Sequence, residues 1–325
     1  MFDFNVEKPS ESTRFDTVEK WDFLVIGGGP AGLNAALYAK RKGLEAAIVA
    51  DEVGGQLHNT TDVDNYLGFS LIEGPKLSDA FFEHVTKLEI PILNNVKVKT
   101  IVHRNPDFII TTSDGRSIAT RTALIATGGT PKKLGIPGED TFANKGVTYC
   151  ATCDAPFFKD KHVVVAGGGN SAAEGVLDLV PWAKKITVVH RSQWRADQVL
   201  LDKLDKVDKL TVHLESQLLS VEGEERMTGV TYRDKVNDTI ESLEADGLLV
   251  EIGNVPKSDF VKDLVDTNDR GEIIVSNNQM TSVPGLYAAG DVTTQPDKQI
   301  IISAGEGAKA ALSANQYLNH EYKGE

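Results

Sequence analysis

Two stretches of the chain follow a short apolar run with a cluster of glycines and then a helical pattern. The first stretch begins with a largely apolar strand pattern at 22–26 and continues through glycine-rich residues 27–32 and a helical pattern to residue 42. It ends in a second, largely apolar strand pattern at 45–50. Apolar, β-branched runs of this length are typical of strands buried on both faces of a sheet. The pattern predicts a strand, a tight turn, a helix and a second strand.

The same succession returns 140 residues later. A strand pattern at 162–166 leads into the glycines 167–169, then into a helix to about Leu179 and a strand at 185–190. Each succession would supply one half of a doubly wound parallel sheet. We therefore predict an α/β fold with two Rossmann-like, three-layer dinucleotide-binding domains.

The glycine turns carry the chemistry of this prediction. The first glycine of each turn permits a sharp bend, the second lets the backbone approach a pyrophosphate, and a small third residue, Gly32 or Ala172, lets the helix pack on the strand. The free N–H groups at the helix start suit the pyrophosphate charge. One such turn could be without function, but two in matching register predict that the chain binds two dinucleotides.

The residues after the second strand of each unit distinguish the two nucleotides. An acidic residue there binds a free ribose hydroxyl, whereas arginine accommodates a 2′-phosphate. Asp51 follows the first unit, which suits FAD. Arg191 and Arg195 follow the second unit and could converge on the phosphate of NADPH, although two solvated surface arginines would give the same pattern.

Other junctions between a strand and a glycine suggest how the domains are connected. A strand ending in Gly290 and Asp291 precedes a helical pattern at 299–318, where the carboxylate could bind a polyol chain and the helix dipole could face a flavin. Similar junctions at 124–129 and 249–253 bracket the second unit, which predicts one domain inserted into another. The FAD-binding domain would take residues 1–127 and 250–325, the NAD(P)H-binding domain 130–248, with crossings near 127–133 and 247–254.

Composition excludes several other classes of protein. Hydrophobic residues make up 41% of the 325 residues and charged residues 25%, as in ordinary globular proteins. The net charge of −13 disfavours a nucleic-acid binder, because no basic surplus is present to neutralise phosphates. No apolar run approaches the roughly 20 residues that span a bilayer, and the first residues mix acidic and basic types, unlike a secretory signal. We expect a cytoplasmic protein without membrane or nucleic-acid partners.

The two cysteines of the chain form a single Cys-x-x-Cys pair, Cys150 and Cys153. This spacing allows a small redox-active disulfide ring at a helix start. A zinc site would need two more ligands, and the seven histidines are scattered, so no metal is predicted. Two inert buried cysteines are the other alternative. Asp154 could pass a proton to a departing thiolate, could cap a short helix, or could do both.

With these motifs the chain resembles the low-molecular-weight thioredoxin reductases over nearly its whole length after about residue 20. The matching motifs are GGGPAG (27–32), GGQL (54–57), ATGG (126–129), CATCD (150–154), GGGNSAAEG (167–175), HRSQWRA (190–196) and AAGDVTTQPDKQIIISAGEG (288–307). The resemblance implies that Cys153 faces the flavin, that Cys150 exchanges with the disulfide of thioredoxin, and that Asp154 is the general acid. It also implies a homodimer whose two domains rotate between the two electron-transfer steps.

Motifs and resemblance together give the candidate cofactor-binding residues. For FAD they are Gly27, Gly29, Pro30, Ala31, Gly32, Asp51, Gly55, Gln56, Leu57, Asn65, Ala126, Thr127, Gly128, Gly290, Asp291, Lys298, Gln299 and Ile300. For the nicotinamide nucleotide they are Gly169, Asn170, Ser171, Glu174, His190, Arg191 and Arg195.

Three departures from the family pattern bear on the cofactors and the partner. His190 replaces the first of two adjacent arginines in the family's HRRxxxRA stretch, so NADH use is possible as well as NADPH. Ala50 stands where many relatives have an acidic residue, with Asp51 as its substitute. The C-terminal motif is closer to the flavoprotein component of alkyl hydroperoxide reductase, which carries extra N-terminal thioredoxin-like modules. Because only about 20 residues precede the first strand here, we expect a separate carrier protein.

The expected function is electron transfer from NADPH through FAD and the Cys150–Cys153 disulfide to thioredoxin or a related small dithiol protein. One alternative is an NADH-dependent reductase of a glutaredoxin-like or peroxiredoxin-linked carrier. A second alternative is a flavin dithiol oxidase, although such an enzyme would not need the nicotinamide-binding motif GGGNSAAEG. A third alternative is a flavin-bearing interaction protein without enzymatic activity.

Overall fold

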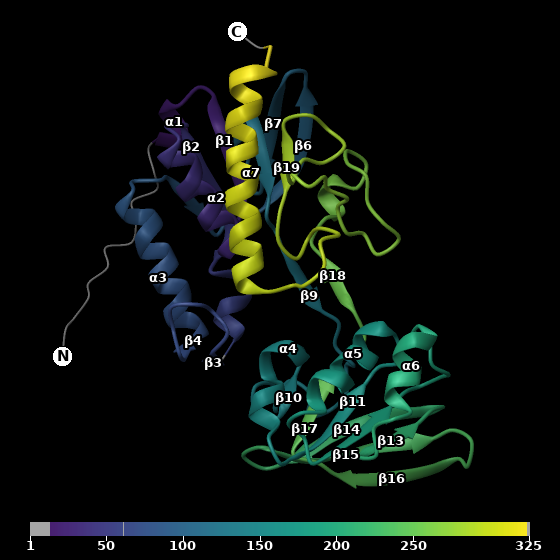
Figure 1. Ribbon diagram of the computed structural model, residues 1–325. Coiled ribbons are helices and arrows are strands. Elements are labelled where there is room, and N and C mark those ends of the chain that lie inside the picture. Colours follow the sequence, from purple (N-terminus) through teal and green to yellow (C-terminus); the bar gives the residue numbers. More distant parts are fainter. Residues whose placement is uncertain (1–13, 61, 324–325) are drawn as a thin grey trace, which may run out of the picture. The chain divides into compact units, whose positions relative to one another are not determined.

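The chain folds into two compact units in the computed structural model, which describes residues 14–60 and 62–323. The first unit consists of the residues up to Thr130 and from Val255 onward, and the second consists of Pro131–Asn254. Figure 1 shows both units, with the first in purple, blue and yellow and the second in teal and green. Each unit has its own hydrophobic core.

The first unit is built on a seven-stranded sheet with the order β5-β2-β1-β8-β7-β6, with β19 also paired to β8. The pairs β1–β2, β1–β8, β2–β5 and β8–β19 are parallel, whereas β6–β7 and β7–β8 are antiparallel. The strands are β1 (Trp21–Gly28), β2 (Ala46–Val53), β5 (Ile92–Asn94), β6 (Val98–Arg104), β7 (Asp107–Thr112), β8 (Ser117–Ile125) and β19 (Leu286–Ala288). The parallel part is the predicted Rossmann-like sheet, and the antiparallel hairpin extends it.

The remaining elements of the first unit are helices and short strands. Its α-helices are α1 (Arg14–Thr17), α2 (Pro30–Arg41), α3 (Gly74–Lys87) and α7 (Ile300–His320), and its 3-10 helices are η1 (Gly55–Asn59) and η3 (Asp259–Val261). Strands β3 (Asp62–Val63) and β4 (Ile72–Glu73) form a small hairpin, and β9 (Gly129–Pro131) pairs with β18 (Asn254–Pro256) where the chain passes between the units.

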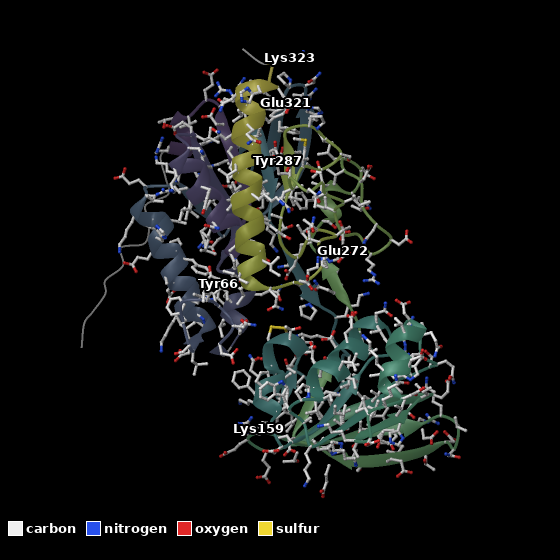
Figure 2. All side chains as sticks on the ribbon, in the orientation of Figure 1. Tyr66, Lys159, Glu272, Tyr287, Glu321 and Lys323 are labelled. Carbon is white, nitrogen blue, oxygen red and sulfur yellow. A yellow bond between two sulfur atoms is a disulfide. The ribbon has the colours of Figure 1, made fainter. Side chains whose placement is uncertain are left out.

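Alternating side chains of β1 build the two cores of the first unit. Phe23 and Val25 pack with α2 and α7 on one face, and Leu24 and Ile26 pack with the other core on the opposite face. Tyr287 on β19 is fully buried beside α7 (Figure 2). The apolar part of β1, Phe23–Ile26, is therefore buried on both sides, as the sequence predicts.

Two glycines let the helices of the first unit approach closely. A Cβ atom added to Gly32 would lie 2.0 Å from the carbonyl oxygen of Gly27, so α2 starts directly against the glycine turn. A Cβ atom added to Gly307 would lie 1.9 Å from the carbonyl oxygen of Ala31, so α7 crosses the start of α2 at backbone distance. The two helices run side by side in Figure 1. This packing fixes the turn that precedes α2.

The second unit has an all-parallel sheet with the order β10-β17-β11-β12-β13. Its strands are β10 (Val147–Thr148), β11 (His162–Ala166), β12 (Lys185–Val189), β13 (Leu210–His213) and β17 (Gly247–Val250), and its helices are α4 (Ala151–Asp154), η2 (Ala155–Phe158), α5 (Asn170–Leu179) and α6 (Gln198–Leu204). Val163 and Val165 pack with α4 and α5. Val164 and Ala166 pack with an antiparallel sheet made of β14 (Ser216–Gly223), β15 (Met227–Asp234) and β16 (Thr239–Glu244).

The predicted α/β class with two Rossmann-like domains is confirmed. Two details differ from the sequence prediction. Strand β2 continues to Val53, three residues beyond its predicted end, because Val53 is still paired with Gly28. The antiparallel sheet β14–β16 was not predicted, since its strands contain no glycine motif. Among the described helices, none combines the length and the apolar character that crossing a bilayer requires.

Candidate redox centre and dinucleotide sites

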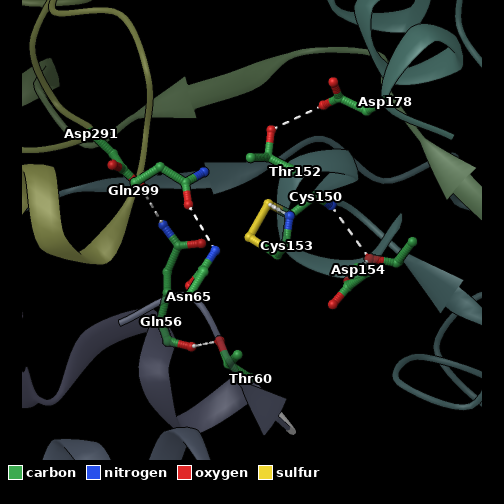
Figure 3. The surroundings of a disulfide bond; sticks show 11 residues. Gln56, Thr60, Asn65, Cys150, Thr152, Cys153, Asp154, Asp178, Asp291 and Gln299 are labelled. Carbon is green, nitrogen blue, oxygen red and sulfur yellow. Dashed lines mark hydrogen bonds between the residues drawn. A yellow bond between two sulfur atoms is a disulfide. The ribbon is translucent and has the colours of Figure 1, made fainter. Parts of the chain in front are cut away.

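The predicted cysteine pair forms a disulfide across the start of α4. Cys150 is the N-cap residue of this helix, and its sulfur accepts a hydrogen bond from the N–H of Cys153 at 3.2 Å. The two Cα atoms are 5.3 Å apart, a usual separation for a disulfide. Both cysteines are half-buried. Figure 3 shows the bond at the start of this short helix.

Asp154 lies at the opposite end of α4. Its carboxylate accepts a hydrogen bond from the hydroxyl of Thr148, and its N–H donates to the carbonyl oxygen of Cys150 at 3.1 Å. The side chain makes no capping hydrogen bond to the 3-10 helix that follows, so the capping alternative is wrong. The carboxyl group is tied to the strand that leads into the cysteine pair. Its proton-donor role stays a prediction.

The first glycine turn leaves a space bounded by backbone. Gly27 has a φ of +119°, and a Cβ atom there would lie 2.2 Å from the carbonyl oxygen of Ala126. A Cβ atom on Gly29 would meet nothing within 4 Å. No side chain caps α2, which begins at Pro30, so its first N–H groups point into that space. These features fit a pyrophosphate at the N-terminus of α2.

Asp51 provides an acidic side chain near this turn. It is exposed at the end of β2, and its carboxylate lies 3.4 Å from the ammonium group of Lys97. An added Cβ atom on Gly28 would lie 3.0 Å from the Cβ of Ala50, which places the end of β2 beside the turn. An accessible carboxylate in this position fits the ribose of FAD.

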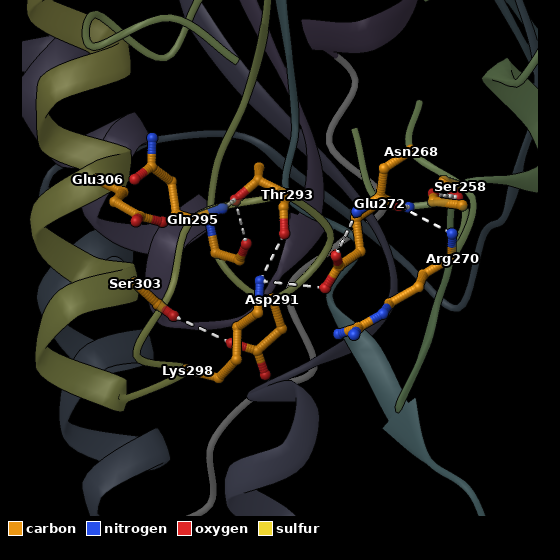
Figure 4. Close-up of polar contacts among 12 residues, drawn as sticks. Ser258, Asn268, Arg270, Glu272, Asp291, Thr293, Gln295, Lys298, Ser303 and Glu306 are labelled. Atoms are coloured by element: carbon orange, nitrogen blue, oxygen red, sulfur yellow. Dashed lines mark hydrogen bonds and ion pairs between the residues drawn. The ribbon is translucent and has the colours of Figure 1, made fainter. Parts of the chain in front are cut away.

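A second polar group of the first unit gathers around Asp291. The amide of Gln56 donates to its carboxylate at 3.1 Å and to the carbonyl oxygen of Gly129 at 3.0 Å. The hydroxyl of Ser303 donates to the same carboxylate at 3.4 Å (Figure 4). Burial raises the pKa of Asp291, and the nearby charge of Lys298 opposes that rise. The structure thus brings together three of the predicted FAD residues, Gln56, Asp291 and Lys298.

Two other contacts extend this polar group. Asn65 donates to the side-chain oxygen of Gln299 at 3.2 Å. Glu306 accepts the N–H of Gly290 at 2.7 Å, and burial raises its pKa. Sequence reasoning did not single out Glu306 or Ser303. The signal was present, because both lie in the helix that follows the Gly-Asp junction.

The second glycine turn is anchored to the arginine-containing loop. Asn170 and Asp197 exchange two hydrogen bonds, each of 2.8 Å, and the N–H of Arg195 donates to the carbonyl oxygen of Gly168 at 2.7 Å. A Cβ atom on Gly169 would meet nothing within 4 Å, as at the first turn. This geometry fits a second dinucleotide at the start of α5.

Arg191 and Arg195 are both exposed on this loop. Among the residues that the structure describes, no carboxylate forms an ion pair with either guanidinium. Two unpaired cations at the carboxyl end of β12 fit the 2′-phosphate of NADPH.

His190 lies on the inner side of the same loop. It is 5% exposed, its ring nitrogen lies 3.1 Å from the hydroxyl of Ser192, and a Cβ atom on Gly168 would lie 2.2 Å from its ring. Burial lowers the pKa of His190, and the charges of Arg195 and Arg191 lower it further. Both effects disfavour the protonated, positively charged form of this ring. The exposed positive charges of this loop are those of Arg191 and Arg195.

Glu251 is a polar residue near the disulfide that sequence reasoning missed. It directly follows β17 and is half-buried, and a Cβ atom added to Gly175 would lie 3.5 Å from its Cγ and 3.3 Å from the Cβ of Ala151 in α4. Burial raises the pKa of Glu251 to about 7, and the charges of Asp178 and Glu174 act in the same direction. The available signal was an acidic residue at the end of a fully apolar strand.

Comparison with known proteins identifies the family of this chain. The family model described as "Pyridine nucleotide-disulphide oxidoreductase" matches residues 21–311. The chain belongs to this family. The family description names a pyridine nucleotide and a disulphide, and this chain forms a disulfide between Cys150 and Cys153.

Solved structures of this oxidoreductase family are similar over most of the chain. Thioredoxin reductase from Streptococcus pyogenes MGAS5005 is 36% identical with a TM-score of 0.88, and the match covers 93% of this chain and 99% of the other. Thioredoxin reductase from Giardia duodenalis is 30% identical with a TM-score of 0.88, covering 93% and 100%. The resemblance to the low-molecular-weight thioredoxin reductases is confirmed.

Curated relatives within the oxidoreductase family carry a different name. The F subunit of alkyl hydroperoxide reductase in Staphylococcus aureus strain N315 is 38% identical over 310 residues, which cover 95% of this chain and 61% of the relative. The same protein of Xanthomonas campestris pv. phaseoli is 39% identical over 312 residues, covering 95% and 59%. The chain thus spans about three-fifths of the length of these relatives.

Proposed function

We propose that the protein passes electrons from NADPH through FAD and the Cys150–Cys153 disulfide to thioredoxin. The observation that carries this proposal is the disulfide itself, formed at the N-terminus of α4 between strand β10 and the second glycine turn. The likeness to thioredoxin reductases supports thioredoxin as the partner.

The hydrogen bond at the disulfide supports a role in thiol exchange. After reduction, the N–H of Cys153 would donate to a thiolate on Cys150, as it does to the disulfide sulfur at 3.2 Å. The thiolate is the nucleophile of thiol–disulfide exchange, so a donor held at this sulfur favours the reactive form. Cys150 would attack the partner disulfide, and Cys153 would then displace the partner by closing the ring. Asp154 would supply the proton to the departing thiolate.

FAD would be held by the first unit. Gly29 and the start of α2 would bind its pyrophosphate, Asp51 its ribose, and the polar group around Asp291 the polyol chain. Bound flavin supplies a two-electron carrier between the nucleotide and the disulfide. The second unit would hold NADPH between the turn at Gly169 and the loop that carries Arg191 and Arg195.

Substitution of the two cysteines tests this function. Cys153→Ser should leave NADPH able to bleach the flavin under anaerobic conditions, because the nucleotide and flavin sites are intact. The rate of NADPH-dependent thioredoxin reduction should fall to background, since no disulfide can form. Cys150→Ser is the matched control and should behave in the same way in both assays. Thioredoxin reduction by the Cys153→Ser protein at the wild-type rate would refute the proposed electron path.

The second candidate function is an NADH-dependent reductase of a peroxiredoxin-linked or glutaredoxin-like carrier. The 38% identity to the alkyl hydroperoxide reductase relative over 95% of the chain favours it. Steady-state rates with NADPH and NADH, each measured with thioredoxin and with such a carrier, separate the two functions. The homodimer and the cytoplasmic location stay predictions.

A further inference from the structure

A buried hydroxyl group connects the two ends of helix α4. Thr148 is 7% exposed. Its side-chain oxygen accepts the N–H of Cys150 at 3.3 Å, and its hydroxyl donates to the carboxylate of Asp154. Cys150 is the N-cap residue of α4, and Asp154 is the last residue of that helix. One hydroxyl group is therefore bonded to both ends of the helix that carries the disulfide.

The sheet of the second unit fixes the position of this hydroxyl. Thr148 ends strand β10 and is paired with Leu249 of strand β17. The next residue, Tyr149, donates its hydroxyl to the buried carboxylate of Glu139 at 3.0 Å. A β-branched side chain such as that of threonine also has few accessible rotamers. Thr148 is thus a rigid partner for the groups on α4.

The hydroxyl of Thr148 can hold the side chain of Asp154 in either protonation state. A hydroxyl group has one donor site and two acceptor sites. The donor site of Thr148 faces the carboxylate, and one acceptor site takes the N–H of Cys150. The other acceptor site can take the O–H of a protonated carboxyl group. The contact between Thr148 and Asp154 can therefore persist before and after a proton transfer.

We propose that Thr148 is a positioning residue for the redox centre, holding the carboxyl group of Asp154 at a fixed place relative to the cysteine pair. The inference rests on the proposed function, in which Asp154 is the proton donor. In thiol–disulfide exchange an attacking thiolate forms an S–S bond with Cys150, the bond between Cys150 and Cys153 breaks, and its electron pair leaves on Cys153. The proton of the Asp154 carboxyl group then moves to that sulfur, which leaves a thiol and a carboxylate.

The test measures how fast dithiothreitol reduces the disulfide of the oxidised holoenzyme at neutral pH. Samples are quenched with an alkylating agent, and the reduced fraction is measured by mass spectrometry. Thr148→Val keeps the β-branched shape and removes the hydroxyl, so the second-order rate constant should fall about threefold to tenfold. Thr148→Ser keeps the hydroxyl and should restore the rate constant to within about twofold of the wild-type value.

A double-mutant cycle separates positioning from a structural effect. Asp154→Asn removes the proton donor and should slow the reduction by about tenfold or more. Because Thr148 acts through Asp154, adding Thr148→Val to Asp154→Asn should change the rate constant by less than about twofold. A purely structural role of Thr148 would make the two losses multiply.

Thr187→Val is the matched control. Thr187 is a buried threonine on β12 of the same sheet, and its hydroxyl lies 2.9 Å from the ring nitrogen of His162. Its replacement should leave the rate constant within about twofold of the wild-type value, because this hydroxyl makes no contact with Asp154.

A wild-type rate in Thr148→Val or in Asp154→Asn would overturn the inference. Losses that multiply in the double variant, or a Thr148→Ser protein as slow as Thr148→Val, would do the same. The assay uses neither nucleotide nor thioredoxin. Failure of the proposed electron path would therefore appear in the cysteine-variant assays and leave this result unaffected.

Discussion

At the residue scale, Gly29 and Gly32 of the first turn differ in the space that a side-chain methyl group would find. Gly32 has no room, since its added Cβ atom would lie 2.0 Å from a carbonyl oxygen, whereas Gly29 has open space and an ordinary φ of −79°. Gly32 therefore allows close packing of the helix, and Gly29 leaves room for a ligand. The motif predicts these two roles from position, and the structure gives the distances that a Cβ atom would meet at each glycine.

This difference predicts opposite outcomes for two alanine substitutions. Gly29→Ala should leave the urea stability of the apoprotein within about 0.5 kcal/mol but weaken FAD binding by about tenfold or more, because the methyl group fills the cofactor's space. Gly32→Ala should lower the apoprotein's free energy of unfolding by about 1–3 kcal/mol through overpacking. Urea unfolding and flavin titration of the apoproteins measure both effects. Unchanged flavin affinity in Gly29→Ala would contradict the assignment of the pyrophosphate site.

At the element scale, the loop between β12 and α6 is held at the second glycine turn by backbone and amide contacts. The bonds of Arg195 N–H to Gly168 and of Asn170 to Asp197 leave both arginine side chains unused in the fold. The loop is thus held by other residues, and the side chains of Arg191 and Arg195 make no ion pair among the described residues. Replacing the two arginines should therefore leave the loop in place.

Replacing both arginines should change nucleotide preference without unfolding the loop. Arg191→Ala with Arg195→Ala should raise the KM for NADPH by about tenfold to a hundredfold, since charge-assisted bonds to the 2′-phosphate are lost. The KM for NADH should change by less than about threefold. Arg233→Ala is a matched control, because Arg233 pairs with Asp238 on the antiparallel sheet. Equal losses with both nucleotides in steady-state assays would refute the phosphate assignment.

At the scale of the whole molecule, the chain forms two units whose hydrophobic cores share no residue among the described ones. The first unit is assembled from both ends of the chain, and the second is inserted between them. Because each core closes within its own unit, we expect calorimetry of the apoprotein to resolve two unfolding transitions.

Each cofactor should act on one transition. FAD at about one hundred times its Kd should stabilise the first unit by about 2.7 kcal/mol, and NADP⁺ should stabilise the second by a similar amount. Scanning calorimetry with each ligand in turn measures the shifts. A single transition moved equally by both ligands would contradict this division of the binding sites.

The sequence by itself determined the two βαβ units, the glycine turns and the reactive cysteine pair. These features depend on local patterns, namely apolar runs, glycine spacing and a separation of three residues between sulfurs. Val163 and Val165 face one layer and Val164 another simply because side chains alternate along a strand.

Only the tertiary structure decided which distant residues meet. Glu251 reaches α4 because β17 lies beside β10 and β11 in the sheet, and Gln56 reaches Asp291 across 235 residues of sequence. The ring of His190 packs on Gly168, and burial lowers its pKa, which no spacing rule indicates. The physical reason is that strand order and backbone approach set these contacts and the burial that shifts the pKa values, and neither is encoded in any short stretch of the chain.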